Sequence, residues 1–165
     1  MVNAGRALQV SEQLIGRLLP LLNPFWGMLP RRLWAKTKDF FVYGTEFLPL
    51  AANAVSANRE IQIQSDSHFV IMAAVIVATS VDDLTTVGPP IPQTARLFDT
   101  GSGRELQNHD VHVDNYFGTA ILPAYWTYPK LIKAASTFRT ELTNLSATAA
   151  NVRVDFWGFK IFEKF

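Results

Sequence analysis

The stretch Val152-Arg-Val-Asp-Phe-Trp-Gly-Phe-Lys-Ile-Phe162 decides the fold class, because its first half alternates between apolar and polar side chains. Every second residue from Val152 to Phe156 is apolar, and Arg153 and Asp155 stand between them. Successive side chains of an extended chain point to opposite faces. This period of two therefore predicts a strand with one buried and one exposed face.

Similar patterns extend this prediction over most of the chain. Residues 59–64 alternate in the same way and place Ile61 and Ile63 on one face. Residues 68–79 are almost continuously apolar, which is typical of a strand buried on both sides. About eight short strands with this spacing predict an all-β fold, an antiparallel β-sandwich or jelly roll. With the strand at residues 152–162, we expect further strands at residues 40–48, 96–99, 111–113, 128–134 and 137–145. Turns are expected at Gly101-Ser-Gly103 and at residues 144–151.

The composition limits the possible functions. A chain of 165 residues is long enough for one well-buried domain and too short for two of ordinary size. Charged residues make up 18% of the chain, below the usual quarter or so, which indicates that part of the surface is covered. The absence of cysteine excludes disulfides, thiolate nucleophiles and thiolate metal sites. We expect no cofactor.

The charge is distributed unevenly along the chain. Residues 1–38 carry six basic groups and one acidic group, whereas residues 39–165 carry nine basic and thirteen acidic groups. The first part therefore has a net charge of +5 and the second a net charge of −4, in agreement with +1 for the whole chain. We predict a basic N-terminal arm over residues 1–38 and a β-sandwich domain over residues 39–165.

The arm is apolar as well as basic, but Pro20, Pro24 and Pro30 interrupt it. A helix longer than about two or three turns does not fit between these prolines. A bilayer needs roughly 20 uninterrupted apolar residues, so we expect no membrane-spanning helix. Arg31 and Arg32 follow the apolar run instead of preceding it, which disfavours a signal peptide and export.

One short helix is expected in the arm, at residues 11–19 with Ser11 as its N-cap, and the rest of the arm should be extended. The arm has two alternative roles. It either covers the protein's own core or lies in a groove on a neighbouring subunit, and we favour the second role. Large apolar side chains and arginine are the types that interfaces favour. The expected partner-binding residues are Leu18, Leu22, Phe25, Trp26, Arg31, Arg32 and Trp34.

Asp99 begins the segment Asp99-Thr-Gly-Ser102, which resembles the signature of aspartic proteases. Such an enzyme needs a second carboxylate about 3 Å from the first, because two like charges at that distance share one proton. The chain contains one such segment, so a protease would have to be a dimer. The simpler interpretation is a hairpin turn with a Gly-Ser-Gly tip, and we favour this interpretation.

Residues 108–114 carry two histidines and two aspartates. On a strand, Asp110, His112 and Asp114 would project from one face and offer metal ligands, but His109 and His112 would lie on opposite faces. We therefore expect no metal site and favour a solvated edge strand or an interface with another copy. The aromatic residues between 116 and 128 have three alternative roles. They fill the end of the sandwich, they line a subunit interface, or they stack on sugars. The possible oligomer-interface residues are His109, His112, Tyr125, Trp126 and Tyr128.

The basic arm gives some support for nucleic acid as a partner, and the β-sandwich domain, here called the body, gives little. A single-strand binder combines a basic groove with stacking aromatic residues. In the body, the basic residues are spread singly among thirteen acidic ones. We therefore do not expect nucleic acid to be the partner.

An ordered set of short motifs in the second half of the chain resembles small virion proteins of tailed bacteriophages. The resemblance covers about residues 40–162 and leaves the arm outside it. It implies a β-sandwich on or within the particle, such as a capsid decoration or cement protein, and proteins of this kind often associate as trimers. The motifs are Asp99-Thr-Gly-Ser-Gly-Arg-Glu-Leu106, Tyr116-Phe-Gly-Thr119, Leu122-Pro123, Pro129 with Leu131, Ser136-Thr-Phe138, Leu142-Thr-Asn-Leu-Ser146 and Asn151-Val-Arg-Val-Asp-Phe-Trp-Gly-Phe-Lys-Ile-Phe162.

Together these patterns predict a non-enzymatic virion protein that is assembled in the host cytoplasm and lies on the capsid surface. Its expected partners are the major capsid protein and other copies of itself, the copies forming a trimer. Three alternatives remain. The chain could be a neck or tail ring or adaptor protein, a glycan-binding host-attachment module, or a dimeric aspartic protease that uses Asp99.

Overall fold

A computed structural model describes residues 38–53, 56–79, 81, 93–119 and 121–162. The predicted short helix at residues 11–19 and the seven partner-binding residues of the arm lie outside the described residues. These features stay predictions.

The described part of the chain is built of β-strands, as the alternating patterns predict, with one short 3₁₀ helix. Three of the strands are thirteen residues long, and two are only two residues long. The strands are β1 (Lys38–Leu50), β2 (Ser56–Gln62), β3 (Ser67–Thr79), β4 (Gln93–Asp99), β5 (Arg104–Glu105), β6 (Val111–His112), β7 (Ala124–Ile132), β8 (Thr137–Asn144) and β9 (Ala150–Phe162), and the 3₁₀ helix is η3 (Val113–Asn115).

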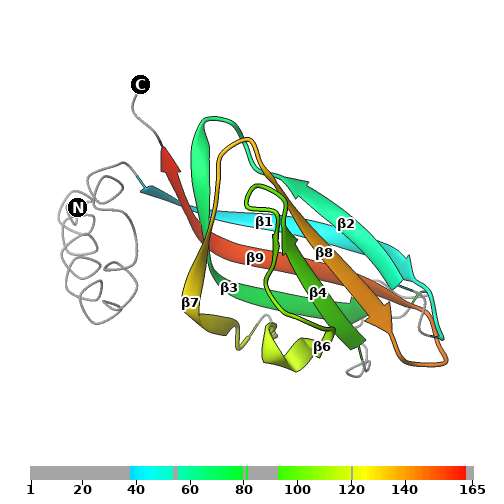
Figure 1. Cartoon of the computed structure of the whole chain (residues 1–165). Coiled ribbons are helices and arrows are strands. Elements are labelled where there is room, and N and C mark those ends of the chain that lie inside the picture. Colours follow the sequence, from blue (N-terminus) through cyan, green and yellow to red (C-terminus); the bar gives the residue numbers. More distant parts are fainter. Residues whose placement is uncertain (1–37, 54–55, 80, 82–92, 120, 163–165) are drawn as a thin grey trace, which may run out of the picture. The chain divides into compact units, whose positions relative to one another are not determined.

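The strands form two antiparallel sheets that face each other (Figure 1). Sheet A has the strand order β1-β9-β3-β7. Sheet B has the order β2-β8-β4-β5, and β6 also pairs with β4. Most consecutive strands lie in different sheets, so the chain crosses repeatedly from one sheet to the other. This wrapping is that of a jelly roll, and the predicted antiparallel β-sandwich is confirmed.

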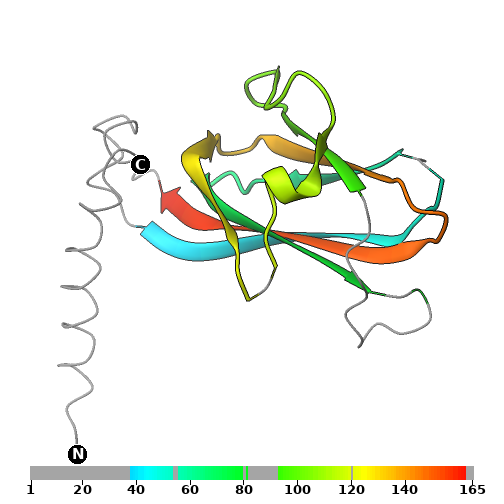
Figure 2. The ribbon, with the colours of Figure 1, turned by 90° about the horizontal axis from the view of Figure 1, so that it is seen from below.

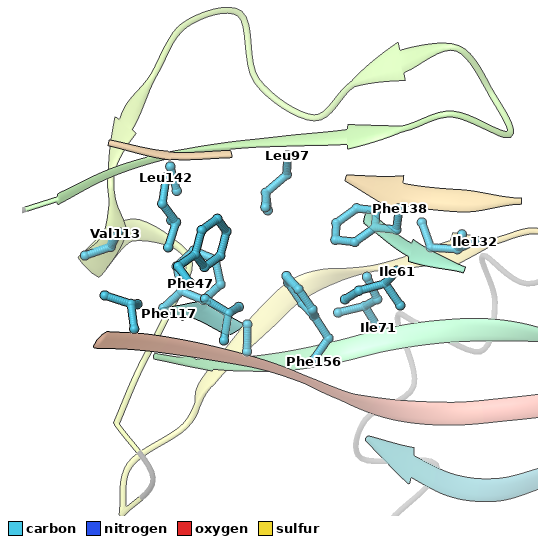
Figure 3. Close-up of a cluster of buried hydrophobic side chains, with 14 of the residues drawn as sticks. Phe47, Ile61, Ile71, Leu97, Val113, Phe117, Ile132, Phe138, Leu142 and Phe156 are labelled. Atoms are coloured by element: carbon cyan, nitrogen blue, oxygen red, sulfur yellow. The ribbon is translucent and has the colours of Figure 1, made fainter. Parts of the chain in front are cut away.

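The core lies between the two sheets (Figure 3). Phe156 of β9 is at its centre, and its ring packs edge-on against Phe138 of β8, with 5.0 Å between the ring centroids. Ile61 and Ile63 are both buried in this core, as their spacing predicts. Val152, Val154 and Phe156 also point into it, so the alternation in the last strand is confirmed.

The long strands β3 and β9 pack very closely at one point of sheet A. Gly158 lies opposite Ile71 in this pairing. A Cβ atom on Gly158 would overlap the carbonyl oxygen of Val70. Both Val70 and Ile71 are buried although they point to opposite faces, which confirms that β3 is covered on both sides.

Two differences between the predicted and observed strands have a local structural cause. The strand expected at residues 111–113 ends at His112, because the chain turns into η3 there and the His112 side chain accepts a hydrogen bond from the Asp114 amide. The strand expected at residues 128–134 begins earlier, at Ala124. It contains a bulge, since Tyr125 and Lys130 pair with Ala73 and Ile71 and leave four residues between them unpaired.

Candidate functional site

The face of sheet A that points away from sheet B, here called the outer face, carries large apolar side chains. Its composition follows from the strand register, because directly paired residues share a face. Two rows of paired residues cross the sheet from β1 to β7. The first row is Phe40, Phe159, Val70 and Leu131, and the second is Val42, Trp157, Ala73 and Tyr125.

The side chains of the outer face differ in burial from β1 to β7. Phe40 is 60% exposed and Tyr125 is 72% exposed, so both edges of the face present an aromatic ring to solvent. Between them, Val70 and Ala73 are buried. The Phe40 ring packs edge-on against Trp157 and Phe159, with centroid separations of 6.4 and 6.1 Å. The exposed ring of Phe40 is therefore held in place by its neighbours.

A short turn beside β7 presents two more apolar side chains. Ile121 is 96% exposed and Leu122 is 77% exposed. The Thr119 amide donates to the Leu122 carbonyl oxygen at 3.0 Å, and the Leu122 amide donates to Thr119 Oγ1 at 3.1 Å. Figures 2 and 3 show the yellow segment that leads into β7 extending past sheet A on the side away from sheet B. We call Gly118, Thr119, Ile121 and Leu122 the apolar turn.

The apolar turn is fixed to sheet A through Gly118. The Gly118 amide donates to the Ala74 carbonyl oxygen at 3.0 Å, and the Gly118 carbonyl oxygen accepts from the Ile76 amide at 2.9 Å. A Cβ atom on Gly118 would overlap the backbone of Leu122 and Ala124. Only glycine lets the chain fold back so tightly at this position.

The outer face changes character toward the other end of its strands. Glu46, Arg153 and Asp155 lie there, with Arg153 Nη1 3.6 Å from Glu46 Oε1 and Arg153 Nε 3.1 Å from Asp155 Oδ1. The hydrogen bond and the negative charge of Asp155, with a smaller effect of Glu46, outweigh desolvation and raise the pKa of Arg153. An apolar area bordered by charged groups is the usual anatomy of a protein interface.

The three predicted aromatic interface residues are divided between two environments. Trp126 is partly buried, with its ring 6.3 Å from that of Phe156 and its indole N–H donating to the Tyr116 carbonyl oxygen at 2.9 Å. Tyr125 and Tyr128 are exposed. The bulge in β7 explains this division, because it breaks the strict alternation of faces along the strand.

The two predicted interface histidines lie at the edge of sheet B, away from the tyrosines of sheet A. His112 pairs with Thr94 of β4, and its Nδ1 atom is 3.2 Å from Asp114 Oδ2. His109 is exposed and its Nδ1 atom is 2.6 Å from Asn108 Oδ1. Within the described residues, no group of three or more His, Asp or Glu side chains is arranged to hold a metal ion.

The third histidine, His68, is a hydrogen-bonded residue near the beginning of β3. His68 Nδ1 accepts a hydrogen bond from the Ala134 amide at 2.9 Å. No helix in the described part of the chain has the length and apolar character needed to cross a bilayer.

Asp99 stands at the end of β4, where the hairpin predicted for Gly101-Ser-Gly103 is confirmed by the pairing of Asp99 with Arg104. Ser102 Oγ donates to Asp99 Oδ2 at 2.7 Å, and Lys130 Nζ lies 3.0 Å from the same oxygen. Burial acts to raise the pKa of Asp99, but the hydrogen bonds from Ser102 and Lys130 and the Lys130 charge outweigh it. The pKa of Asp99 therefore lies below its ordinary value. An ionised carboxylate held by a cation and a serine has a structural role in the hairpin.

Sequence reasoning missed four residues of the candidate site. Phe40 and Val42 lie in the strand predicted at residues 40–48, but its sequence does not show which side chains point to which face of the sheet. The sequence analysis did not predict the exposure of Ile121 and Leu122. The signal for the turn was present, since Leu122-Pro123 follows Gly118 and Thr119 closely. The predicted arm residues lie outside the described residues.

Comparisons with known proteins add little to this description. No protein-family model matches the chain, and no curated protein matches it. Among solved structures, the chain is similar to the protein in "Crystal structure of infectious bursal disease virus VP2 subviral particle", at 11% sequence identity and a TM-score of 0.26. The similarity covers 77% of this chain and 42% of that chain, so this chain spans less than half the length of the viral protein. The fold is defined by its strand order.

Proposed function

We propose that this chain is a structural protein of a bacteriophage virion, a capsid decoration protein that binds the major capsid protein and other copies of itself. A jelly roll occurs in viral capsid domains, in lectins and in cupins, so the fold alone does not select among these functions. The ordered motifs that resemble small phage virion proteins favour the virion.

One observation carries the proposal: apolar side chains are exposed on sheet A and on the turn beside it. Phe40, Tyr125, Ile121 and Leu122 are all well exposed on the outer face of sheet A or on the apolar turn beside it. Monomeric soluble proteins rarely expose large contiguous apolar areas, and such areas mark interaction sites. A decoration protein would bury this apolar surface against the subunits that it covers.

The arm has a separate role in this proposal. Its net charge of +5 over residues 1–38 and its large apolar side chains suit an acidic groove on the major capsid protein. Phe25, Trp26 and Trp34 would supply the apolar anchors, with Arg31 and Arg32 as charge partners. The β-body would then stand on the capsid surface. A trimer, the number implied by the resemblance, is one arrangement of such bodies.

The test is binding of the purified chain to particles assembled without it, followed by sedimentation through a density gradient. We expect the chain to move with the particles. A chain that stays at the top of the gradient would contradict the proposal. Arg31→Glu should weaken binding, whereas the matched variant Arg104→Glu, in the exposed hairpin of sheet B, should not.

The position in the particle is tested separately by labelling virions with a gold-conjugated antibody against the chain. Label distributed over the capsid supports a decoration protein. Label confined to the junction of head and tail would assign the chain to a neck or tail ring.

A further inference from the structure

We infer that the outer face of sheet A binds a second copy of this chain, and that each copy places its apolar turn on the Phe40 side of the other copy's face. This inference rests on the proposed function in one respect, since it names the partner of the same exposed face. It does not depend on where in a virion the protein lies.

One body carries two complementary apolar features. The apolar turn is a projection that bears Ile121 and Leu122, and it lies beside β7 at one edge of sheet A. The exposed aromatic ring of Phe40 lies on β1, at the opposite edge of the same sheet. A projection at one edge and an apolar area at the other allow two copies to contact each other twice.

The apolar turn and the outer face point in the same direction. The apolar turn extends on the side of sheet A that faces away from sheet B, which is also the side that the outer face presents (Figure 2). On each copy, the apolar turn and the outer face point the same way. The turn of one copy can therefore contact the outer face of another copy only when the two outer faces lie opposite each other. Opposed faces give a two-fold axis in the plane of the interface, and such an interface pairs residue i with residue j twice. A three-fold ring would set the faces at an angle and separate the turn from the neighbouring face.

The exposed apolar surface is large enough for a stable interface. The exposed parts of Phe40, Val42, Tyr125, Ile121 and Leu122, with smaller parts of their neighbours on the outer face, amount to on the order of 800 Å². Stable protein interfaces bury about 800 Å² on each partner. Glu46, Arg153 and Asp155 would lie at the border, where both charge signs can pair with the same groups of the partner.

The experiment measures the mass of the purified full-length chain by light scattering across a concentration series. We expect the mass of two chains. The double variant Ile121→Asp with Leu122→Asp and the single variant Phe40→Asp should each raise the dissociation constant at least about 100-fold, because each substitution disrupts both symmetric contacts. The matched control is Leu145→Asp, since Leu145 is exposed in the loop between β8 and β9 and should not affect the mass.

Mixing the two variants tests the reciprocal geometry. A copy with an intact turn and a copy with an intact Phe40 side share one undamaged contact, whereas each variant alone has none. Mixed pairs should therefore form more tightly than pairs of either variant alone. Mixing that restores nothing would overturn the inference, as would a mass of one or three chains for the unaltered protein.

Other occupants of the face give other results. If residues 1–37 of the same chain cover the face, the unaltered protein has the mass of one chain. If they join copies, deleting them abolishes the pair while Phe40→Asp does not, and either result overturns the inference. Attachment to particles is measured independently by sedimentation, so the proposed virion function can fail or stand without deciding this inference.

Discussion

Asp99 on β4 and Lys130 on β7 form an ion pair between the two sheets, with 3.0 Å between the carboxylate Oδ2 and the ammonium Nζ. The Asp99 side chain is almost fully buried, and Lys130 is partly buried. Ser102 donates to the same carboxylate through both its hydroxyl and its amide. The pair thus links the hairpin that follows β4 to an edge strand of sheet A.

Replacing Asp99 with asparagine should lower the free energy of unfolding by about 2 kcal/mol at neutral pH, because Lys130 then stays partly buried without its anion. Urea denaturation followed by tryptophan fluorescence measures the change. Asp114→Asn is the control, since Asp114 is highly exposed in η3 and should change little.

The effect of Asp99→Asn should also depend on pH. The pKa of Asp99 is lowered on folding, so its contribution to stability is fully present above the ordinary value of 3.8 and is lost as the pH falls through the lower folded-state pKa. Repeating the denaturation at falling pH should therefore show that the difference in free energy of unfolding between the unaltered protein and Asp99→Asn decreases progressively below about pH 4. A difference that stays constant over this range would show that the ion pair is not its cause.

The fold could be predicted from the sequence because most strands bury one face only. In β9 and in residues 59–64, a period of two separates core residues from solvent-facing ones. The outer face of sheet A could not be predicted in this way. Phe40, Phe41, Val42 and Tyr43 are all apolar or aromatic, and only the register with β9 shows that Phe40 and Val42 point away from the core.

Bulges and interrupted strands mark a second limit of sequence patterns. Alternation predicts a side chain's face only while the pairing register is unbroken. In β7 the bulge turns Trp126 toward Phe156 and leaves Tyr128 exposed, although the two residues are two apart. The same limit applies after His112, where β6 ends and the chain turns into η3. The single face that a continuous strand would give to Asp110, His112 and Asp114 therefore does not form.

Gln107 bridges the gap between the short strands β5 and β6, and its replacement should destabilise sheet B. Its side-chain nitrogen Nε2 donates to the Ala95 carbonyl oxygen at 2.8 Å, and its oxygen Oε1 accepts from the Leu97 amide at 3.3 Å. Gln107→Ala leaves these buried backbone groups without a partner, which costs about 1–3 kcal/mol. Asn108 in the same loop is exposed and hydrogen-bonds through Oδ1 to the neighbouring His109 ring, so Asn108→Ala should be nearly neutral. Equal effects of the two variants in urea denaturation would contradict this role.

Phe156→Ala and Phe40→Ala remove the same side chain from opposite faces of sheet A. Phe156 is buried among Phe117, Phe138 and Trp126, so its loss should cost about 3–5 kcal/mol. Phe40 is exposed, so its loss should change the free energy of unfolding by less than about 1 kcal/mol while reducing self-association. Thermal unfolding by circular dichroism at low protein concentration, where copies are separate, makes the comparison. A large loss of stability in Phe40→Ala would place Phe40 in the core.

Gly158→Ala should be among the most damaging single-methyl substitutions in this chain. The added Cβ atom would overlap the carbonyl oxygen of Val70, and neither backbone can move without breaking the pairing of β3 with β9 in the middle of sheet A. We expect a loss of at least about 3 kcal/mol, a large part of the total stability of an ordinary domain. Gly44→Ala is the matched control, because its Cβ would meet the flexible Asp155 carboxylate at 2.6 Å, and that side chain can rotate away. Thermal unfolding of the two variants measures the difference, and equal melting temperatures would mean that β3 and β9 do not pack as closely as described.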